Sequence, residues 1–354
     1  MGISAARDPE ALRRGFTRWL SAWRPDRPAP TLAPLAQPAT GLSSETFLLD
    51  VDWGDAATHD SFVVRLPPEG DGLFPHYDLA AQGRVQQLLR AAGVPAVDPL
   101  AVELDPVWIG APFLLMPRVA GRVVRADTPF LRTGWLAEAP PAGQARLHDG
   151  FLDLLAAIHG VDLSTGAYDF LPGGPQRRGG LTLAAETDRW ASYLAWAADG
   201  DVPEPFARGL AWCRSHRPDP EPPPSLLWGD VQLGNVLVAE DMTIAAVLDF
   251  EMASVGPAEL DVAWFLVLHR MTVDRCGGDL AGFPDHADTV RAYERRLGRP
   301  LAGLRWFEVF AAVRSGAIMV RAARLLSRLG VDDSWLTVGN PTVSLLETLL
   351  GEGA

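Results

Sequence analysis

Short alternating runs of apolar and polar residues characterise the first third of the chain. Residues 46–53 (TFLLDVDW) and 61–68 (SFVVRLPP) alternate in this way and are close in sequence, which predicts the two strands of a hairpin. Residues 8–23 and 77–93 instead place apolar side chains at helical spacing, and the second of these segments ends at Gly93. The pattern predicts a small antiparallel sheet accompanied by helices.

Helical periodicity takes over beyond residue 118. It predicts helices at residues 142–160, 182–198, 286–297, 304–329 and 341–350, and a buried helix that starts near Glu259. Two short apolar runs, 236–238 and 244–250, predict strands joined by a polar turn at Glu240 and Asp241. We expect three parts: an opening helix and linker (1–30), a small sheet-based domain (31–118) and a larger, mainly helical domain (119–354).

The charge balance of the chain is acidic. All 31 basic residues are arginines, 44 residues are acidic, and the formal net charge is −13. This excess would repel nucleic acids and anionic membrane surfaces, so neither is expected as a partner. Arg314, Arg321, Arg324 and Arg328 recur about one helical turn apart, a spacing typical of a solvated helix face.

The cysteines and the apolar segments indicate the compartment. Cys213 and Cys276 are too few for a disulfide framework and lie at no metal-ligand spacing. The first residues lack the apolar core of a signal peptide, and the longest later apolar run, around residues 262–268, is too short to span a bilayer. We expect a cytoplasmic protein.

The stretch with the clearest chemistry covers residues 225–251 (SLLWGDVQLGNVLVAEDMTIAAVLDFE). Asp230 and Asn235 each follow a turn-forming glycine, and Asp249 lies near the end of the second apolar run. Carboxylate and amide oxygens are hard ligands suited to Mg²⁺, and a carboxylate that binds no metal can accept a proton. Taken singly, each residue also has a structural interpretation as a turn residue or helix cap. Together they form the set of groups that phosphoryl transfer requires.

The order of these residues resembles that of a known family. WGDVQLGN (228–235) and VLDFE (247–251) resemble the HGDxxxxN and (I/V)(I/L)DWE signatures of the aminoglycoside phosphotransferase family, and in particular members related to the kinase-like domain attached to some acyl-CoA dehydrogenases. Trp228 stands where the family usually has a scaffold histidine. The resemblance implies a two-lobed, protein-kinase-like α+β fold with a small antiparallel-sheet lobe and a mainly helical lobe. It also implies Mg²⁺-dependent transfer of the γ-phosphate of ATP to a substrate hydroxyl.

The same resemblance implies roles within this stretch. Asp230 would accept the hydroxyl proton, and Gln232 would orient the substrate or a metal-bound water. Asn235 and Asp249 would hold Mg²⁺ against ATP. Strand alternation would put Glu251 on the same side as Asp249, where it would bind a second metal, its waters or a substrate amine. An equal alternative for Glu251 is a structural role as the cap of the next helix.

Two further residues are assigned to the scaffold. Asp261 lies where kinase-like folds use an acid to brace the catalytic loop through backbone N–H groups. An acid in the first turn of a helix is also favoured by the helix dipole, and both interpretations predict the same location. His159, at the end of a predicted helix, is expected to be a packed or capping residue.

A nucleotide site is implied in the small lobe. The small-residue turn before the predicted hairpin could lay backbone N–H groups against a phosphate. Arg65 corresponds to the strand cation that holds the α- and β-phosphates, a position where the family more often has lysine. An apolar strand running into residues 116–119 resembles the hinge that contacts adenine. The residues predicted to contact ATP are Gly41, Ser43, Ser44, Thr46, Arg65, Met116 and Val119.

Two other function classes remain open. One is a nucleotide-binding protein of kinase-like fold without turnover, which Arg65 and the lack of an evident acidic partner for it would suit. The other is a metal-dependent hydrolase, which should have more histidine ligands than a chain with seven histidines and none in residues 225–251 provides. The hydroxyl-bearing small molecule that accepts phosphate is open, and a homodimer is among the assemblies left open.

Overall fold

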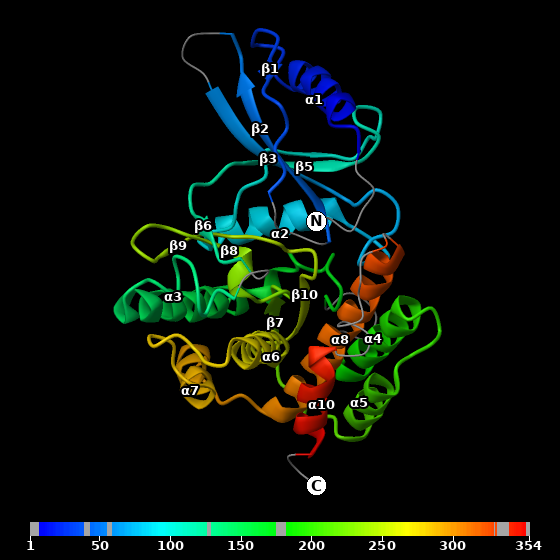
Figure 1. The fold of residues 1–354 in the computed structure, drawn as a ribbon, viewed down its shortest axis with the longest axis vertical. Helices are drawn as coiled ribbons and strands as arrows, with labels where there is room; N and C mark the ends of the chain where they lie inside the picture. The colour runs from blue at the N-terminus through cyan, green and yellow to red at the C-terminus, as the bar shows by residue number, and fades with distance from the viewer. Residues whose placement is uncertain are drawn as a thin grey trace. The chain divides into compact units, whose positions relative to one another are not determined.

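The structure is a computed structural model of the 354-residue chain. The chain forms two compact units (Figure 1), of which the first ends at Val119, within the segment interpreted as the hinge. The first unit contains Met1–Arg90 and Ala96–Val119, and the second contains Ala91–Pro95 and Ala120–Ala354. The residues described are 7–38, 43–54, 59–125, 129–174, 182–328, 330 and 340–351.

The first unit is based on a five-stranded antiparallel sheet. Its strands, in spatial order, are β1 (Thr31–Leu32), β2 (Glu45–Asp52), β3 (His59–Leu66), β5 (Phe113–Pro117) and β4 (Ala101–Glu103). The predicted hairpin is β2 and β3, in which Thr46 lies opposite Arg65. Burial alternates along both strands, because one face of the sheet forms the core.

Helix α1 (Pro9–Trp23) covers one face of this sheet (Figure 1). Asp8 caps the helix by accepting the N–H of Glu10. An apolar stripe on α1 packs against alternate residues of β2, β3 and β5. The core residues are Leu12, Phe16, Trp19 and Leu20 from the helix, with Phe47, Leu49, Phe62, Val64, Phe113 and Leu115 from the sheet. The opening helix is therefore part of the first unit's core.

Helix α2 (Leu79–Ala91) packs on the opposite face. Gly83 lies so close to Val102 and Leu114 that a Cβ would need those side chains to move. Gln86 Nε2 lies 3.4 Å from the sulfur of Met116. Because side chains alternate along a strand and Arg65 pairs with Leu114, Arg65 lies on this α2 side of the sheet.

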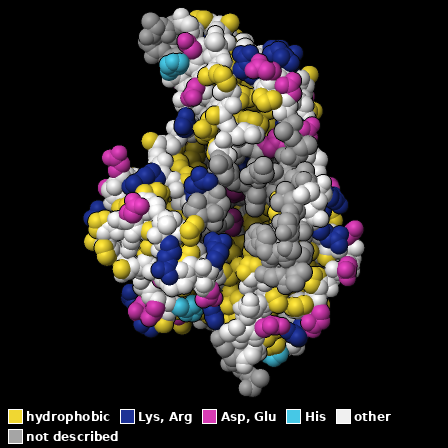
Figure 2. Space-filling view, in the orientation of Figure 1, with side chains coloured by type: hydrophobic (Ala, Val, Ile, Leu, Met, Phe, Trp, Pro, Cys, Tyr) yellow, Lys and Arg dark blue, Asp and Glu magenta, His cyan; other side chains and the backbone are white. Residues whose placement is uncertain are grey.

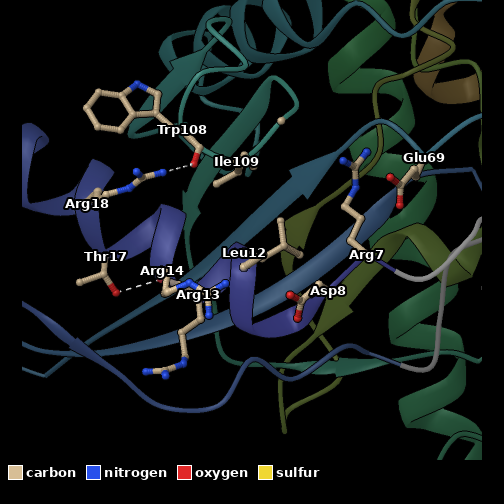
Figure 3. Close-up of a pocket in the computed structure, with 12 residues that line it drawn as sticks. Arg7, Asp8, Leu12, Arg13, Arg14, Thr17, Arg18, Glu69, Trp108 and Ile109 are labelled. Atoms are coloured by element: carbon tan, nitrogen blue, oxygen red, sulfur yellow. Dashed lines mark hydrogen bonds between the residues drawn. The ribbon is translucent and has the colours of Figure 1, made fainter.

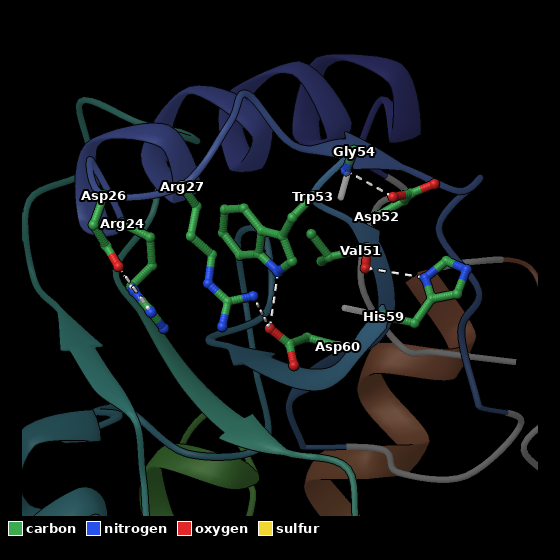
Figure 4. Close-up of polar contacts among 9 residues, drawn as sticks. All are labelled: Arg24, Asp26, Arg27, Val51, Asp52, Trp53, Gly54, His59 and Asp60. Atoms are coloured by element: carbon green, nitrogen blue, oxygen red, sulfur yellow. Dashed lines mark hydrogen bonds and ion pairs between the residues drawn. The ribbon is translucent and has the colours of Figure 1, made fainter. Parts of the chain in front are cut away.

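A polar cluster joins the segment after α1 to the end of the hairpin where β2 leads into β3 (Figure 4). Trp53 Nε1 donates to Asp60 Oδ2 at 2.8 Å, and Arg27 Nη1 lies 3.4 Å from the same oxygen. The Arg27 guanidinium also lies 5.2 Å from the centre of the Trp53 ring, within cation–π range. This cluster positions the proline-rich segment alongside the sheet.

The second unit combines two small antiparallel sheets with helices. One sheet pairs β7 (Pro224–Leu227) with β10 (Ser254–Pro257), and the other has the order β6 (Arg122–Val123), β8 (Val236–Val238) and β9 (Ile244–Val247). The helices are α3 (Pro141–His159), α4 (Leu183–Ala197), α5 (Glu204–Ser215), α6 (Glu259–Cys276), α7 (His286–Leu297), α8 (Leu304–Arg328) and α10 (Pro341–Gly351), with 3-10 turns η1 (Leu163–Thr165) and η2 (Leu233–Asn235).

Three details of this unit differ from the sequence predictions. Helix α5 falls in a segment for which no helix was predicted. Strand β9 ends at Val247 and not at residue 250, because Asp249 has a left-handed backbone (φ 61°) that a strand cannot contain. The predicted solvated arginine face is wrong for Arg314 and Arg321, which are 4% and 5% exposed and lie over tryptophan rings.

The described surface mixes both signs of charge. On the face shown in Figure 2, arginine and acidic side chains are interspersed, so the net charge of −13 is not gathered into one acidic region of that face. Among the described residues, we find no helix of sufficient length and apolar character to cross a membrane.

Candidate active site

The loop between β7 and β8 carries Asp230 and Asn235. The residue before Asp230 is Gly229, which has φ 93° and lies where a Cβ would overlap the main-chain oxygen of Met252. Only glycine meets both conditions without strain. The loop then tightens into η2, where Asn235 N–H donates to the carbonyl of Gln232 at 3.0 Å. This conformation brings the loop against the segment that follows β9.

Trp228 joins the loop to that segment. Its fully buried indole donates from Nε1 to the carbonyls of Leu248 (2.8 Å) and Asp249 (2.9 Å). The ring also packs near Phe151 and Phe250. The loop that carries Asp230 and the segment that carries Asp249 are therefore held together by one side chain.

A buried acid supports the loop from α6. Asp261 accepts the N–H groups of Trp228 (2.7 Å, at Oδ2) and Gly229 (3.0 Å, at Oδ1). His159 Nε2 lies 3.0 Å from Asp261 Oδ2, and His159 Nδ1 contacts the hydroxyl of Tyr293. His159 is thus packed in the core, but it does not cap α3, whose C-cap is Gly160. Asp261 makes the backbone contacts that the resemblance implied.

Asp230 lies at the centre of a ring of donors. Its Oδ1 accepts Trp264 Nε1 at 3.0 Å, and its Oδ2 accepts Gln232 Nε2 at 2.6 Å and Asn235 Nδ2 at 2.7 Å. Burial and the charge of Asp249 raise the pKa of the Asp230 carboxyl, although the three hydrogen bonds lower it. The residue keeps part of its surface accessible. A positioned carboxylate with a raised pKa is suited to accept a proton.

Asn235 ends this loop, and Asp249 lies in the segment that follows β9. Asn235 Nδ2 also donates to the main-chain oxygen of Asp230 at 3.0 Å, so its amide oxygen is turned away from that residue. The carbonyl of Asn235 accepts Leu248 N–H at 2.8 Å, which extends the pairing of β8 with the segment before Asp249. The structure therefore brings together the three oxygen-bearing residues predicted from the sequence.

Glu251 does not follow Asp249 by strand alternation, so that prediction is wrong. Beyond Val247 the chain has left the sheet, and the left-handed backbone at Asp249 ends the alternation of side chains. Glu251 N–H instead lies 3.4 Å from Asp249 Oδ1, in a local turn. Nor does Glu251 cap the next helix, because β10 intervenes and the N-cap of α6 is Ala258.

The donor set fits a Mg²⁺ ion that is shared with a phosphate ligand. Asp249, Glu251 and the amide oxygen of Asn235 are hard oxygen donors. Throughout the part of the chain that the structure describes, no group of three or more His, Cys, Asp and Glu side chains could hold a metal. Mg²⁺ is commonly held by one or two carboxylates together with substrate phosphates and water, and not by a complete protein cage.

Comparison with known proteins decides the family. The model of the phosphotransferase enzyme family matches residues 34–307. The chain belongs to this family. Acyl-CoA dehydrogenase family member 11 of Homo sapiens is 25% identical to this chain over 266 residues, which are 74% of this chain and 31% of that protein. The Gallus gallus protein of the same name is 28% identical over 259 residues, 73% of this chain and 30% of that protein. The chain thus spans under a third of these curated relatives.

Solved structures of phosphotransferases share the fold. A proposed aminoglycoside phosphotransferase of Ralstonia eutropha JMP134 has a TM-score of 0.67 at 21% identity and covers 96% of this chain and 98% of that one. A second neighbour is a thermostable mutant of aminoglycoside phosphotransferase APH(4)-Ia in ternary complex with AMP-PNP and hygromycin B. Its TM-score is 0.56 at 19% identity, and the match covers 96% of this chain and 99% of that one. The predicted protein-kinase-like α+β fold is confirmed.

The described residues among those predicted to contact ATP lie in the first unit of this phosphotransferase-family chain. Ser44, Thr46 and Arg65 are brought together, since Thr46 faces Arg65 across the hairpin and Arg65 Nη2 lies 3.4 Å from Ser44 Oγ. Ser43, which precedes Ser44 in the sequence, is buried. Gly41 lies outside the described residues. Met116 is in β5, and Val119 ends the unit.

Two residues of this hydrogen-bond network, Trp264 and Tyr293, were not predicted from the sequence. Trp264 donates to Asp230, and its position three residues after Asp261 on α6 could have indicated that both face the same loop. Tyr293 on α7 contacts His159, a contact between residues far apart in sequence that no local pattern signals.

A separate cavity of about 930 Å³ lies along α1 in the first unit (Figure 3). Arginines of α1, among them Arg14 and Arg18, line it together with Trp108. Arg18 donates to the main-chain oxygen of Trp108 at 3.2 Å. The cavity contains none of the predicted site residues that the structure describes, so it is not the candidate active site.

Proposed function

We propose that this member of the phosphotransferase enzyme family transfers the γ-phosphate of ATP to a hydroxyl of a small molecule in a Mg²⁺-dependent reaction. The observation that carries the proposal is the Asp230 carboxylate, held by three donors and left partly accessible beside Asp249 and Asn235. Phosphoryl transfer needs positioned groups and charge stabilisation more than covalent chemistry, and these residues provide both.

In this proposal Asp230 takes the proton of the acceptor hydroxyl. The hydroxyl oxygen forms a bond to the γ-phosphorus, and the bond from that phosphorus to the bridging oxygen of the β-phosphate breaks. The raised pKa of Asp230, caused by burial and by Asp249, makes the carboxylate a better proton acceptor than an ordinary aspartate. Gln232 and Asn235 keep its orientation fixed through Oδ2.

Asn235 and Asp249 are the proposed Mg²⁺ ligands, and Glu251 is a further ligand for the metal or its waters. When bound, Mg²⁺ would neutralise charge on the phosphates. The hydrogen bond from Trp228 to the carbonyl of Asp249 keeps this backbone in position without using its carboxylate. The site therefore presents oxygen donors of the kind that suits a hard cation.

For the nucleotide, the proposed contacts come from Ser43, Ser44, Thr46 and Arg65 for the phosphates and from Met116 and Val119 for adenine, with Gly41 as a predicted phosphate contact. The guanidinium of Arg65 would bind phosphate as a fork and not as a point charge. The AMP-PNP bound in the APH(4)-Ia complex supports an ATP-type nucleotide as the ligand proposed here.

The acceptor is proposed only as a hydroxylated small molecule. The ternary complex of the APH(4)-Ia aminoglycoside phosphotransferase holds hygromycin B, and another structural neighbour is a macrolide 2′-phosphotransferase of Brachybacterium faecium. The curated relatives instead carry an acyl-CoA dehydrogenase name. A screen should therefore contain aminoglycosides, macrolides, hydroxy acids and hydroxyacyl thioesters.

Transfer of labelled γ-phosphate from ATP to this panel, with and without Mg²⁺, tests the proposal. We expect a phosphorylated product with the wild-type protein and Mg²⁺. Asp230→Asn should abolish transfer and keep the affinity for the nucleotide. Normal turnover by Asp230→Asn would remove this residue from its role. Nucleotide binding without any product across the panel would favour the alternative of a binding protein without turnover.

A further inference from the structure

Arg314 occupies an unusual environment inside the second unit. It lies in the middle of α8, is 4% exposed, and has no hydrogen-bond partner for Nε within the described structure. Its guanidinium carbon lies 4.9 Å from the ring centre of Trp190 on α4 and 4.8 Å from that of Trp264 on α6. Burying a charge in this way is costly unless its surroundings stabilise it. The aromatic faces supply that stabilisation through cation–π contacts.

Trp264 connects this cation to the candidate active site. The face of its indole ring contacts the Arg314 guanidinium. The Nε1–H group of the same ring donates to Asp230 Oδ1 at 3.0 Å. A cation over an indole ring draws electron density from it and makes the N–H a stronger donor. The side chains of Arg314, Trp264 and Asp230 therefore form a continuous chain from α8 to the loop.

The two oxygens of Asp230 are not equivalent. Oδ2 accepts two hydrogen bonds, from Gln232 and Asn235, whereas Oδ1 accepts one, from Trp264. A carboxylate oxygen has two lone pairs, so Oδ1 has room for one more donor. A substrate hydroxyl that approaches Asp230 would then donate its hydrogen bond to Oδ1. Trp264 holds the oxygen that would take the proton.

The charged groups around Arg314 agree with this arrangement. Burial lowers the pKa of Arg314 to about 10, and the charge of Arg189 acts in the same direction. The carboxylates of Glu186, Asp261 and Asp230 oppose this effect. Glu186 itself is buried and accepts hydrogen bonds from Arg189 and from Trp190. Arg314 is therefore placed among three carboxylates, one of which is Asp230.

We propose that Arg314 and Trp264 are positioning residues that fix the orientation of Asp230 for proton acceptance at Oδ1. This inference rests on the proposed function for its catalytic consequence, but the contact itself can be tested without turnover. Arg314 acts through the indole of Trp264 and does not touch the substrate. Aliphatic packing at position 314 would fill the space but would not polarise the indole.

Indole resonances of the ¹⁵N-tryptophan-labelled full chain test the contact. The chain has 12 tryptophans, and Trp264→Phe identifies the resonance of Trp264 by its loss. We expect this resonance to move in Asp230→Asn and in Arg314→Met, and to stay near its original position in Arg314→Lys. The other indole resonances report whether each variant is folded. A Trp264 resonance that is unchanged in both Asp230→Asn and Arg314→Met, with the fold intact, would overturn the inference.

Steady-state kinetics test the consequence. Trp264→Phe and Arg314→Met should lower kcat by about 10- to 100-fold with little change in KM for ATP, because a small misplacement of a reacting group costs this much. Arg314→Lys should recover most of the loss. The matched control is Arg321→Met, which removes another buried arginine of α8, 4.2 Å from the Trp196 ring, and should leave kcat unchanged. Equal losses in Arg321→Met and Arg314→Met would contradict a specific role.

The two assays separate this inference from the proposed function. If no acceptor is phosphorylated by the wild-type protein but the resonance moves as expected, the proposed function fails and the positioning of Asp230 is supported. If transfer is found and kcat is unaffected by Arg314→Met and Trp264→Phe, the positioning role fails and the proposed function stands.

Discussion

Asp261→Asn removes the charge that supports the candidate catalytic loop while keeping the shape of the side chain. In the wild-type protein, the carboxylate accepts the N–H groups of Trp228 and Gly229 and lies 3.0 Å from Nε2 of His159. All of these groups are buried. An asparagine has one acceptor oxygen, so its NH₂ group must face a donor at one of these positions.

The cost can be worked out from these contacts. If the amide oxygen takes the place of Oδ2, the N–H of Gly229 loses its acceptor, and a buried donor without a partner costs about 1–3 kcal/mol. Replacing the charged acceptor by a neutral one weakens the remaining bonds, for which we add about 1 kcal/mol. We expect Asp261→Asn to lower the free energy of unfolding by about 2–4 kcal/mol. Because the loop carries Asp230, phosphate transfer should fall as well.

Urea-induced unfolding and hydrogen exchange measure the two parts of this prediction. The loop amides of Trp228 and Gly229 should exchange faster in Asp261→Asn than in the wild-type protein. Asp274→Asn is the matched control, since Asp274 is an exposed residue of the same helix and its change should stay within about 0.5 kcal/mol. If both variants unfold at the same urea concentration and the loop amides keep their protection, the reasoning about Asp261 is wrong.

Three further predictions concern other buried groups. Trp228→Phe leaves two carbonyls without the indole donor, so it should cost about 1–3 kcal/mol in urea unfolding and weaken Mg²⁺–nucleotide binding in calorimetry; wild-type values in both would contradict this. Burial lowers the pKa of His148 from 6.5 to about 4, and only the unfolded chain binds the proton between these pH values. Unfolding free energy should therefore fall by roughly 3 kcal/mol as pH drops through this range, and by less in His148→Gln. Burial raises the pKa of Cys213, so a thiol reagent should modify Cys276 in the native protein and both cysteines only after unfolding; native modification of Cys213 would refute its burial.

Features with a strong local pattern were predictable from the sequence. The hairpin of β2 and β3 follows from alternation over residues 46–53 and 61–68, and α1 follows from an apolar stripe that starts after Asp8. The motif around Asp230 and Asp249 led to the correct family because the spacing of its polar residues is itself a local property.

Features decided by distant parts of the chain were not predictable in this way. Arg314 looks like a surface residue in a periodic arginine pattern, but two tryptophans from other helices enclose it. The end of β9 depends on the left-handed backbone at Asp249, which is stabilised by the bond from Trp228 and is not evident in the apolar run. Such contacts join residues tens of positions apart, so no window of sequence contains them.

The central claim is that Asp249 and Asn235 help to bind a Mg²⁺–nucleotide beside Asp230. Calorimetric titration of the full chain with AMP-PNP, in the presence and absence of Mg²⁺, tests it most directly. We predict that removal of Mg²⁺ weakens binding to the wild-type protein by at least about tenfold, which corresponds to ~1.4 kcal/mol. Asp249→Asn should bind AMP-PNP in the presence of Mg²⁺ only as weakly as the wild-type protein does without Mg²⁺. Asp230→Asn should keep the wild-type affinity for AMP-PNP in the presence of Mg²⁺. The same dissociation constant for the wild-type protein and Asp249→Asn, with and without Mg²⁺, would contradict the claim.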